Sequence, residues 1–186
     1  MTDTKQKLVK ALMELSKEKS LDKITVTDLV EKCQVSRQIF YYYFVDIYDV
    51  IQWAYVSEAE KVLEENSSIE NWQIGYLLLL QWSKKNKSFM LNAYDSISKK
   101  TIEYFLNKVL YQYILKVVEK DAEGMNVAKE QKEFIANFYT LALNAISLDW
   151  IGRRMVEEPP EVVEKVGIIL KGDFKKSLRE FEKLNI

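Results

Sequence analysis

Apolar residues recur along most of the chain at the three- and four-residue spacing of amphipathic helices. One face of the first predicted helix is formed by Leu8, Ala11, Leu12 and Leu15. The same reasoning predicts helices over residues 4–19, 25–33, 36–44, 46–65, 69–85, 88–95, 98–120, 127–157 and 160–184. None of these segments has the two-residue alternation of a β-strand, so the pattern predicts an all-α fold.

Capping residues divide the first fifty residues into three helices. Thr25 and Asp28 have the T-x-x-D spacing of a capping box at the start of the second helix. Ser36 is a suitable N-cap for the third helix, which follows the second after a tight turn. Two short helices joined in this way are typical of a helix-turn-helix, whose second helix reads DNA.

The long predicted helix over residues 46–65 is expected to connect two domains. The sequence therefore predicts a three-helix DNA-binding domain over residues 1–46 and a larger helical domain over residues 47–186, which binds an effector and dimerises. Loop signals lie at residues 66–68 and 121–126. Pro159 and Pro160 end one helix and start the next, and Gly172 with Asp173 can interrupt the last one.

The third helix has one apolar face and one polar face. Val35, Phe40 and Phe44 are expected to pack inward, which leaves an outward stripe of Arg37, Gln38, Tyr41 and Tyr42. Arginine can donate two hydrogen bonds to guanine, glutamine can pair with adenine, and tyrosine hydroxyls can reach phosphates or base edges. For the tyrosine run taken alone, ordinary packing at the core and surface is an equally good interpretation.

The segment ITVTDLVEKCQVSRQIFYYYF resembles the signature of the tetracycline-repressor (TetR) family of bacterial transcription regulators, commonly ITVxDIxxxAGVSRxTFYxYF. The resemblance covers about residues 4–55. It implies DNA contacts by Thr25, Ser36, Arg37, Gln38, Tyr41, Tyr42 and Tyr43. Tyr41 and Tyr43 would contact phosphate. More loosely, DIYDVIQW and ISLDWIGRRMVEEPPEVVEKV resemble the branch of this family that includes dihydroxyacetone-kinase regulators.

Three positions depart from the family pattern. Gln34 replaces the usual turn glycine and must adopt a left-handed backbone, while Ile39 replaces the usual threonine. Ile47 stands where the family often has a lysine, so one phosphate contact is expected to be missing. Residues 1–50 contain eight basic and eight acidic residues, which predicts a modest electrostatic contribution to DNA binding.

The helix predicted over residues 127–157 carries two apolar stripes. Phe134, Phe138 and Leu141 belong to one stripe, and Ile135 and Tyr139 belong to the other. Either both stripes are internal core or one is left for a second copy of the chain, and the family resemblance favours a dimer through the last two helices. The expected dimer interface comprises Phe138, Ala142, Ile146, Trp150, Val166, Ile169 and Leu170.

Candidate effector-binding residues are aromatic side chains and one amide that can line a cavity between helices. They are Trp72, Tyr76, Trp82, Tyr94, Tyr104, Phe105, Tyr111 and Asn144. Aromatic residues at helical spacing also form ordinary hydrophobic core. The sequence leaves both interpretations open.

Composition excludes most enzyme classes. Histidine is absent, which removes the commonest general base and metal ligand. Cys33 is the only cysteine, and the five glycines are too scattered for a phosphate-binding loop. We therefore expect no enzymatic activity, no metal site and no cofactor.

Targeting and membrane signals are weak. Charged residues interrupt the first fourteen positions, and the longest apolar run covers only residues 74–80, against roughly 18 residues for a membrane span. The expectation is a cytoplasmic protein without a membrane partner. The formal net charge is −1, so overall charge does not itself indicate nucleic-acid binding.

These patterns favour a homodimeric transcriptional regulator that binds double-stranded operator DNA. Its C-terminal domain would sense a small molecule or a partner protein. The alternative is a helical co-regulator or adaptor that acts mainly through protein contacts and has weak DNA affinity.

Overall fold

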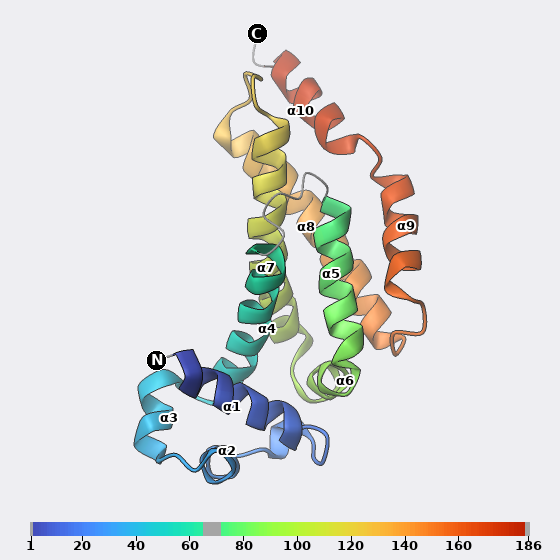
Figure 1. The fold of residues 1–186 in the computed structure, drawn as a ribbon. Helices are drawn as coiled ribbons and strands as arrows, with labels where there is room; N and C mark the ends of the chain where they lie inside the picture. Colours follow the sequence, from blue (N-terminus) through green and yellow to red (C-terminus); the bar gives the residue numbers. More distant parts are fainter. Residues whose placement is uncertain (1, 65–71, 185–186) are drawn as a thin grey trace.

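A computed structural model describes residues 2–64 and 72–184 of the chain (Figure 1). Within these ranges the backbone forms only helices, which confirms the predicted all-α class. The elements are α1 (Thr2–Leu15), the short 3-10 helix η1 (Leu21–Lys23), α2 (Val26–Cys33), α3 (Arg37–Tyr43), α4 (Ile47–Glu64), α5 (Trp72–Lys85), α6 (Lys87–Ser96), α7 (Lys99–Asp121), α8 (Lys129–Gly152), α9 (Pro159–Ile169) and α10 (Asp173–Leu184). The loop predicted over residues 66–68 lies outside the described residues.

The region predicted to be the DNA-binding domain is a small three-helix unit formed by α1, α2 and α3 (Figure 1). Leu8, Leu12, Leu29 and Phe40 are completely buried at its centre. Apolar residues at helical spacing thus meet in one core, which fixes how α3 lies against α1 and α2.

The turn between α2 and α3 contains a strained residue. Gln34 has φ 54° and ψ 43°, the left-handed conformation expected for this position. Its backbone N–H still donates to the carbonyls at the end of α2. Glycine is the residue that adopts this conformation without a clash of its Cβ atom.

Replacing Gln34 with glycine is therefore expected to raise the free energy of unfolding by about 1 kcal/mol. Urea denaturation followed by helical circular dichroism measures the change. Glu31→Gly, in the exposed interior of α2, is the matched control and should lower the free energy of unfolding by about 1 kcal/mol. A Gln34→Gly protein that is less stable than the parent would contradict the strain.

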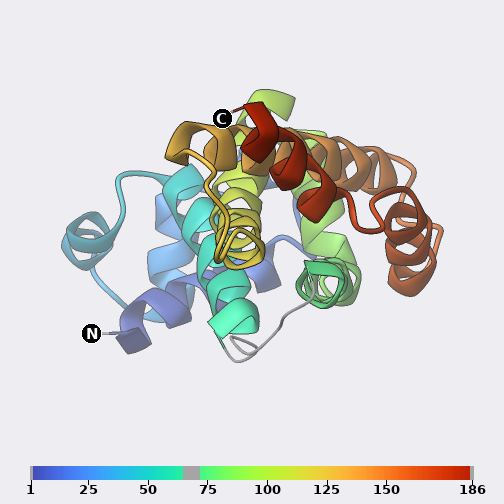
Figure 2. The same ribbon diagram turned by 90° about the horizontal axis from the view of Figure 1, so that it is seen from above.

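The C-terminal domain is built around α7 and α8, which run antiparallel and contact each other along their length (Figures 1 and 2). Helix α4 packs on α7, α5 packs on α9, and α10 contacts the ends of α7 and α8 where these two helices are connected. Trp150 and Leu143 of α8 and Ile114 of α7 are completely buried. The hydroxyl groups of Tyr76 on α5 and Ser147 on α8 form a hydrogen bond, with 3.0 Å between their oxygen atoms. Burial raises the pKa of Tyr76 to about 12.

The predicted end of one helix was wrong. The helix expected over residues 127–157 ends at Gly152, because Arg154 and Met155 have φ angles of 62° and 53° and cannot continue a right-handed helix. The buried Met155 side chain and a 2.7 Å hydrogen bond from the Lys84 ammonium to the Met155 carbonyl hold this turn. The helix expected over residues 160–184 is interrupted at the predicted place, because Gly172, whose φ is 77°, separates α9 from α10.

Helix α8 is the one helix in the described part of the chain that is long and apolar enough to cross a membrane by length and composition alone. Half of its most apolar stretch is buried against the other helices. The core helix of a folded domain can be equally long and apolar, so these two properties do not distinguish a core helix from a membrane span.

Helix α4 continues from the DNA-binding domain into the C-terminal domain (Figure 1). It contacts α1 at one end and packs on α5 and α7 further along. The boundary predicted between residues 46 and 47 coincides with the first residue of α4, Ile47.

Candidate nucleic-acid interface

The outward stripe expected on α3 is exposed in the structure. Arg37, Gln38 and Tyr41 face solvent, and Tyr42 is 72% exposed. Phe40 and Phe44 are buried on the other side of the helix, and Val35 is half-buried. The division into an inner and an outer face therefore agrees with the sequence pattern, while the DNA contacts themselves stay a prediction.

Helix α3 begins at a capped N-terminus. The Ser36 hydroxyl accepts a hydrogen bond from the Ile39 backbone N–H at 3.2 Å. The remaining N–H groups of the first turn point out of the helix end, where the helix dipole favours phosphate. Arg37 follows directly and presents its charge beside this end.

Arg37 is held by a residue that the sequence analysis did not single out. Its guanidinium donates to the hydroxyl of Thr27 on α2. This bond leaves the other guanidinium N–H groups free to donate to a base edge. Thr27 lies two residues after the capping Thr25, so the T-x-T spacing was its only signal in the sequence.

The capping box at the start of α2 is complete and is joined by a lysine. The Asp28 carboxylate accepts hydrogen bonds from the backbone N–H and the hydroxyl of Thr25, both at 2.7 Å. The Lys19 ammonium lies 2.7 Å from the same carboxylate. The Lys19 and Thr25 hydrogen bonds lower the pKa of Asp28 to about 2. The stability that this group contributes is thus present at neutral pH and is lost as the pH falls toward 2.

Tyr43 differs from its two neighbours because it is half-buried. Its ring packs edge-on against Tyr42, with 4.9 Å between ring centroids. The Lys5 ammonium of α1 lies 6.0 Å from the Tyr43 ring centroid and 5.5 Å from that of Trp53 on α4. Lys5 therefore brings a positive charge to the corner where α1, α3 and α4 meet. Lys5 lies well before the TetR-like segment ITVTDLVEKCQVSRQIFYYYF in the sequence, and for this reason the sequence pattern did not indicate a role for it.

Apart from Arg37, the surface of α3 is neutral. Arg37 is the only basic residue between positions 33 and 60. Ile39 is exposed on α3 and can contact a thymine methyl group. Ile47, at the start of α4, is half-buried and packs on the apolar core.

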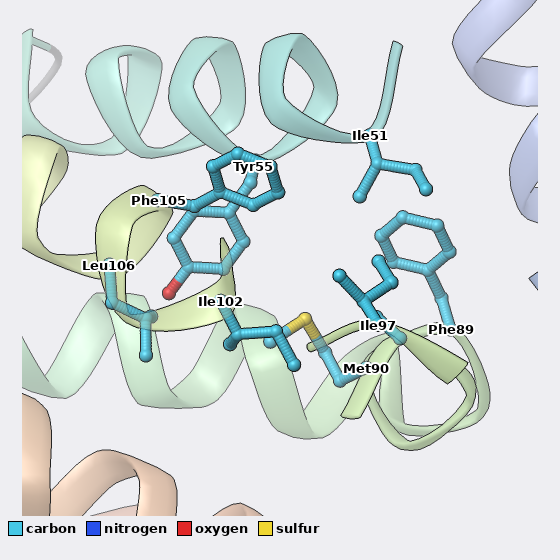
Figure 3. Close-up of a pocket in the computed structure, with 9 residues that line it drawn as sticks. Ile51, Tyr55, Phe89, Met90, Ile97, Ile102, Phe105 and Leu106 are labelled. Carbon is cyan, nitrogen blue, oxygen red and sulfur yellow. The ribbon is translucent and has the colours of Figure 1, made fainter. Parts of the chain in front are cut away.

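A small cavity lies between α4, α6 and α7, close to the DNA-binding domain (Figure 3). Its volume is about 20 Å³ and its lining is entirely apolar, which is room for about one water molecule. The lining residues are Ile51, Tyr55, Phe89, Met90, Ala93, Ile97, Ile102, Phe105 and Leu106.

Of the residues predicted to bind an effector, Phe105 lines this cavity. Trp72, Tyr76 and Asn144 are buried elsewhere in the domain, and Trp82, Tyr94 and Tyr111 are half-buried. Tyr104 differs from these residues because it is 59% exposed on the surface of α7. Asn144 is notable because its buried Oδ1 atom has no hydrogen-bond partner among the residues that the structure describes.

The predicted dimer residues divide into exposed and buried groups. Phe138 is 60% exposed and Ile169 is exposed, while Ala142, Ile146 and Leu170 are half-buried. Trp150 and Val166 are corrections, because both are buried inside the protomer and cannot meet a second copy.

The two apolar stripes of α8 have different surroundings. Ile135 and Tyr139 are internal, whereas Phe134, Phe138 and Leu141 are exposed. One stripe is therefore core and the other is an uncovered apolar surface. Periodicity showed both stripes but could not assign them.

Comparisons with known proteins agree with this architecture. Residues 70–172 match the TetR-type family described as a transcriptional regulator C-terminal region. The chain is 26% identical over 153 residues to the HTH-type dhaKLM operon transcriptional activator DhaS of Lactococcus lactis subsp. lactis (strain IL1403). This match covers 81% of this chain and 80% of that protein.

Two solved structures have a similar fold. The dihydroxyacetone kinase operon activator DhaS has a TM-score of 0.73 and 21% identity, and the match covers 94% of this chain and 98% of that one. The fatty acid degradation regulator FadR from Bacillus halodurans has a TM-score of 0.62 and 13% identity, over 89% of this chain and 93% of that one.

The fold and the exposed α3 stripe define a helix-turn-helix regulator with a helical C-terminal domain. The chain belongs to the TetR family of transcriptional regulators, and within it resembles the DhaS-like branch. It is a DNA-binding transcriptional regulator, and its relatives are regulators rather than enzymes.

Proposed function

We propose that two copies of the chain bind a two-fold symmetric operator, with one α3 helix in each of two successive major grooves. The observation that carries this proposal is the exposed stripe of Arg37, Gln38, Tyr41 and Tyr42 on a helix with a capped N-terminus. The family resemblance implies that Thr25, Ser36 and Tyr43 would contact the DNA as well, with Tyr41 and Tyr43 on phosphate.

The second copy would pack on the exposed apolar stripe of α8. Phe134, Phe138 and Leu141 together leave a large apolar area in water, and monomeric proteins seldom expose such patches. A self-complementary contact across a two-fold axis would cover the stripe in both copies and place the two α3 helices symmetrically.

Control of operator binding would enter through the C-terminal domain, from a small molecule or a partner protein. The apolar lining of the cavity beside α6 offers no hydrogen bond to a polar metabolite. A polar effector would therefore need another site or a rearranged one. By analogy with DhaS, an operon activator, we propose that this protein regulates an operon of the dihydroxyacetone kinase type, in the cytoplasm.

The test is selection of duplexes from a random DNA library by the full-length protein, followed by a band-shift with the enriched sequences. Enrichment of a palindromic site supports the proposal. The neutral surface around α3 favours the alternative, a co-regulator that acts through protein contacts. That alternative predicts no enriched sequence.

Salt dependence tests how α4 meets the phosphates. Ile47→Lys is expected to raise affinity for operator and random duplexes alike, because it adds one phosphate contact per half-site. The slope of log affinity against log salt should steepen by about one unit per half-site. Fluorescence anisotropy across a salt series measures this slope.

The matched control is Gln112→Lys, which adds the same charge at an exposed position of α7 in the C-terminal domain. It should leave the slope close to that of the parent protein. An unchanged slope for Ile47→Lys would show that position 47 does not face the phosphate backbone.

A further inference from the structure

Two side chains of α6 hold the DNA-binding domain by hydrogen bonds to its backbone and to one of its hydroxyls. The amide nitrogen of Asn92 donates to the carbonyl oxygens of Ser16 at 2.8 Å and Lys19 at 2.9 Å. Its Oδ1 atom accepts from the backbone N–H of Leu21 at 2.8 Å. The Ser96 hydroxyl lies 2.7 Å from the Ser20 hydroxyl. We call this set of contacts the α6 latch.

The latch meets the chain where its backbone has lost helical partners. The last four carbonyls of α1 accept hydrogen bonds from residues 16–19, whereas the carbonyls of Ser16 and Lys19 lie after the end of α1, in the connection to η1, and accept from Asn92. Asn92 uses both N–H groups and its oxygen on this segment. Ser96 also donates to Asn92 Oδ1 at 3.0 Å, which fixes the orientation of the amide.

The latched segment continues directly into the helix-turn-helix. The Lys19 carbonyl is held by Asn92, and the Lys19 ammonium holds the Asp28 carboxylate at the N-terminus of α2. Asp28 in turn caps α2 together with Thr25. A short series of polar contacts therefore connects α6 of the C-terminal domain to α2, against which α3 packs.

The same helix also borders the apolar cavity. Phe89 and Met90 line the cavity from α6 (Figure 3), together with Ala93. Asn92 and Ser96 of the same helix contact residues 16–21 instead. The Asp95 carboxylate on α6 also forms an ion pair with the guanidinium of Arg154, which lies just after α8, with 2.7 Å between the nitrogen and oxygen atoms. Helix α6 is thus fixed to both domains.

From this arrangement we propose that Asn92 is a positioning residue that sets the angle of the DNA-binding domain against the C-terminal domain. Helix α4 alone is a single connection, about which the small domain can turn. The α6 latch adds a second anchor on the opposite end of α1 from Lys5, and two anchors prevent that rotation. The proposal rests on the proposed function, because in a dimer this angle determines the separation of the two α3 helices and the spacing of half-sites.

Hydrogen–deuterium exchange tests the latch without DNA. Asn92→Ala should speed exchange of the amides of residues 16–23 roughly tenfold or more, since several hydrogen bonds are lost. Asn92→Asp keeps the side-chain shape but removes both N–H donors. It should speed exchange over the same residues, and it replaces Asn92→Ala if the alanine variant does not fold. Asn86→Ala is the matched control, because the Asn86 amide donates at 3.0 Å to Trp82 within its own domain.

Operator spacing tests the consequence. Duplexes selected by the parent protein are lengthened by one and two base pairs between half-sites, and affinity is measured by anisotropy. The parent should lose roughly tenfold or more in affinity on lengthening, and the Asn92 variants should lose only about threefold. Binding to a single half-site should be the same in all proteins.

Unchanged exchange over residues 16–23, or a spacing profile of the Asn92 variants that equals the parent's, would overturn the positioning role. If the parent protein enriches no duplex, the proposed function has failed instead. The exchange measurement then decides whether Asn92 holds the domain.

Discussion

Replacing Arg37 with alanine should weaken binding to the selected operator by about 1 to 3 kcal/mol per half-site while leaving the fold intact. Arg37 is exposed at the start of α3, and no other basic side chain lies between positions 33 and 60. Its loss removes the one group on this helix that can donate two charged hydrogen bonds to a guanine. Fluorescence anisotropy on operator and random duplexes measures the change.

Arg153→Ala is the charge-matched control for this prediction. Arg153 is exposed in the C-terminal domain and pairs with Asp149 at 2.8 Å. Its removal changes the net charge equally but should not alter DNA affinity. A folded Arg37→Ala protein that binds the operator as tightly as Arg153→Ala would show that α3 does not read bases through Arg37.

Thr27→Val tests the orientation of Arg37 separately from its charge. The guanidinium keeps its charge but loses the hydroxyl that orients it. Operator affinity should therefore fall by less than in Arg37→Ala, while affinity for random duplexes should stay the same.

Local chemistry made much of the DNA-binding domain predictable. The Thr25 and Ser36 caps act within three residues, so their spacing in the sequence already contains the geometry. The left-handed Gln34 was expected from the family resemblance, because the related sequences commonly have a glycine at this turn.

Features that depend on distant partners could not be predicted in this way. Asn92 lies more than 70 positions in the sequence from the three residues whose backbone it contacts. The residues next to it in the sequence form no motif that predicts this contact. The end of α8 at Gly152 also depends on tertiary contacts, since Met155 is left-handed without being a glycine and is held by Lys84. Phe105 alone of the predicted effector residues lines the cavity beside α6, and aromatic periodicity could not specify this because it does not show which helices meet.

The apolar stripes of α8 show the same limit and lead to the second large effect. Trp150 is completely buried and donates from its indole N–H to the Glu157 carbonyl at 3.0 Å, so it belongs to the protomer's own core. Phe138 is on the exposed stripe. We therefore expect a second copy to pack on the Phe138 side of the helix.

Phe138→Glu is expected to raise the dimer dissociation constant at least about 100-fold, because two carboxylates would be buried without partners in a symmetric interface. Sedimentation velocity at micromolar concentration should show a parent dimer and a folded monomeric variant, and operator affinity should fall with the dimer. Val156→Glu, at an equally uncovered apolar residue outside α8 and α9, should leave the dimer intact. A parent protein that sediments as a monomer, or a Phe138→Glu protein that remains dimeric, would show that this stripe of α8 is not where two copies meet.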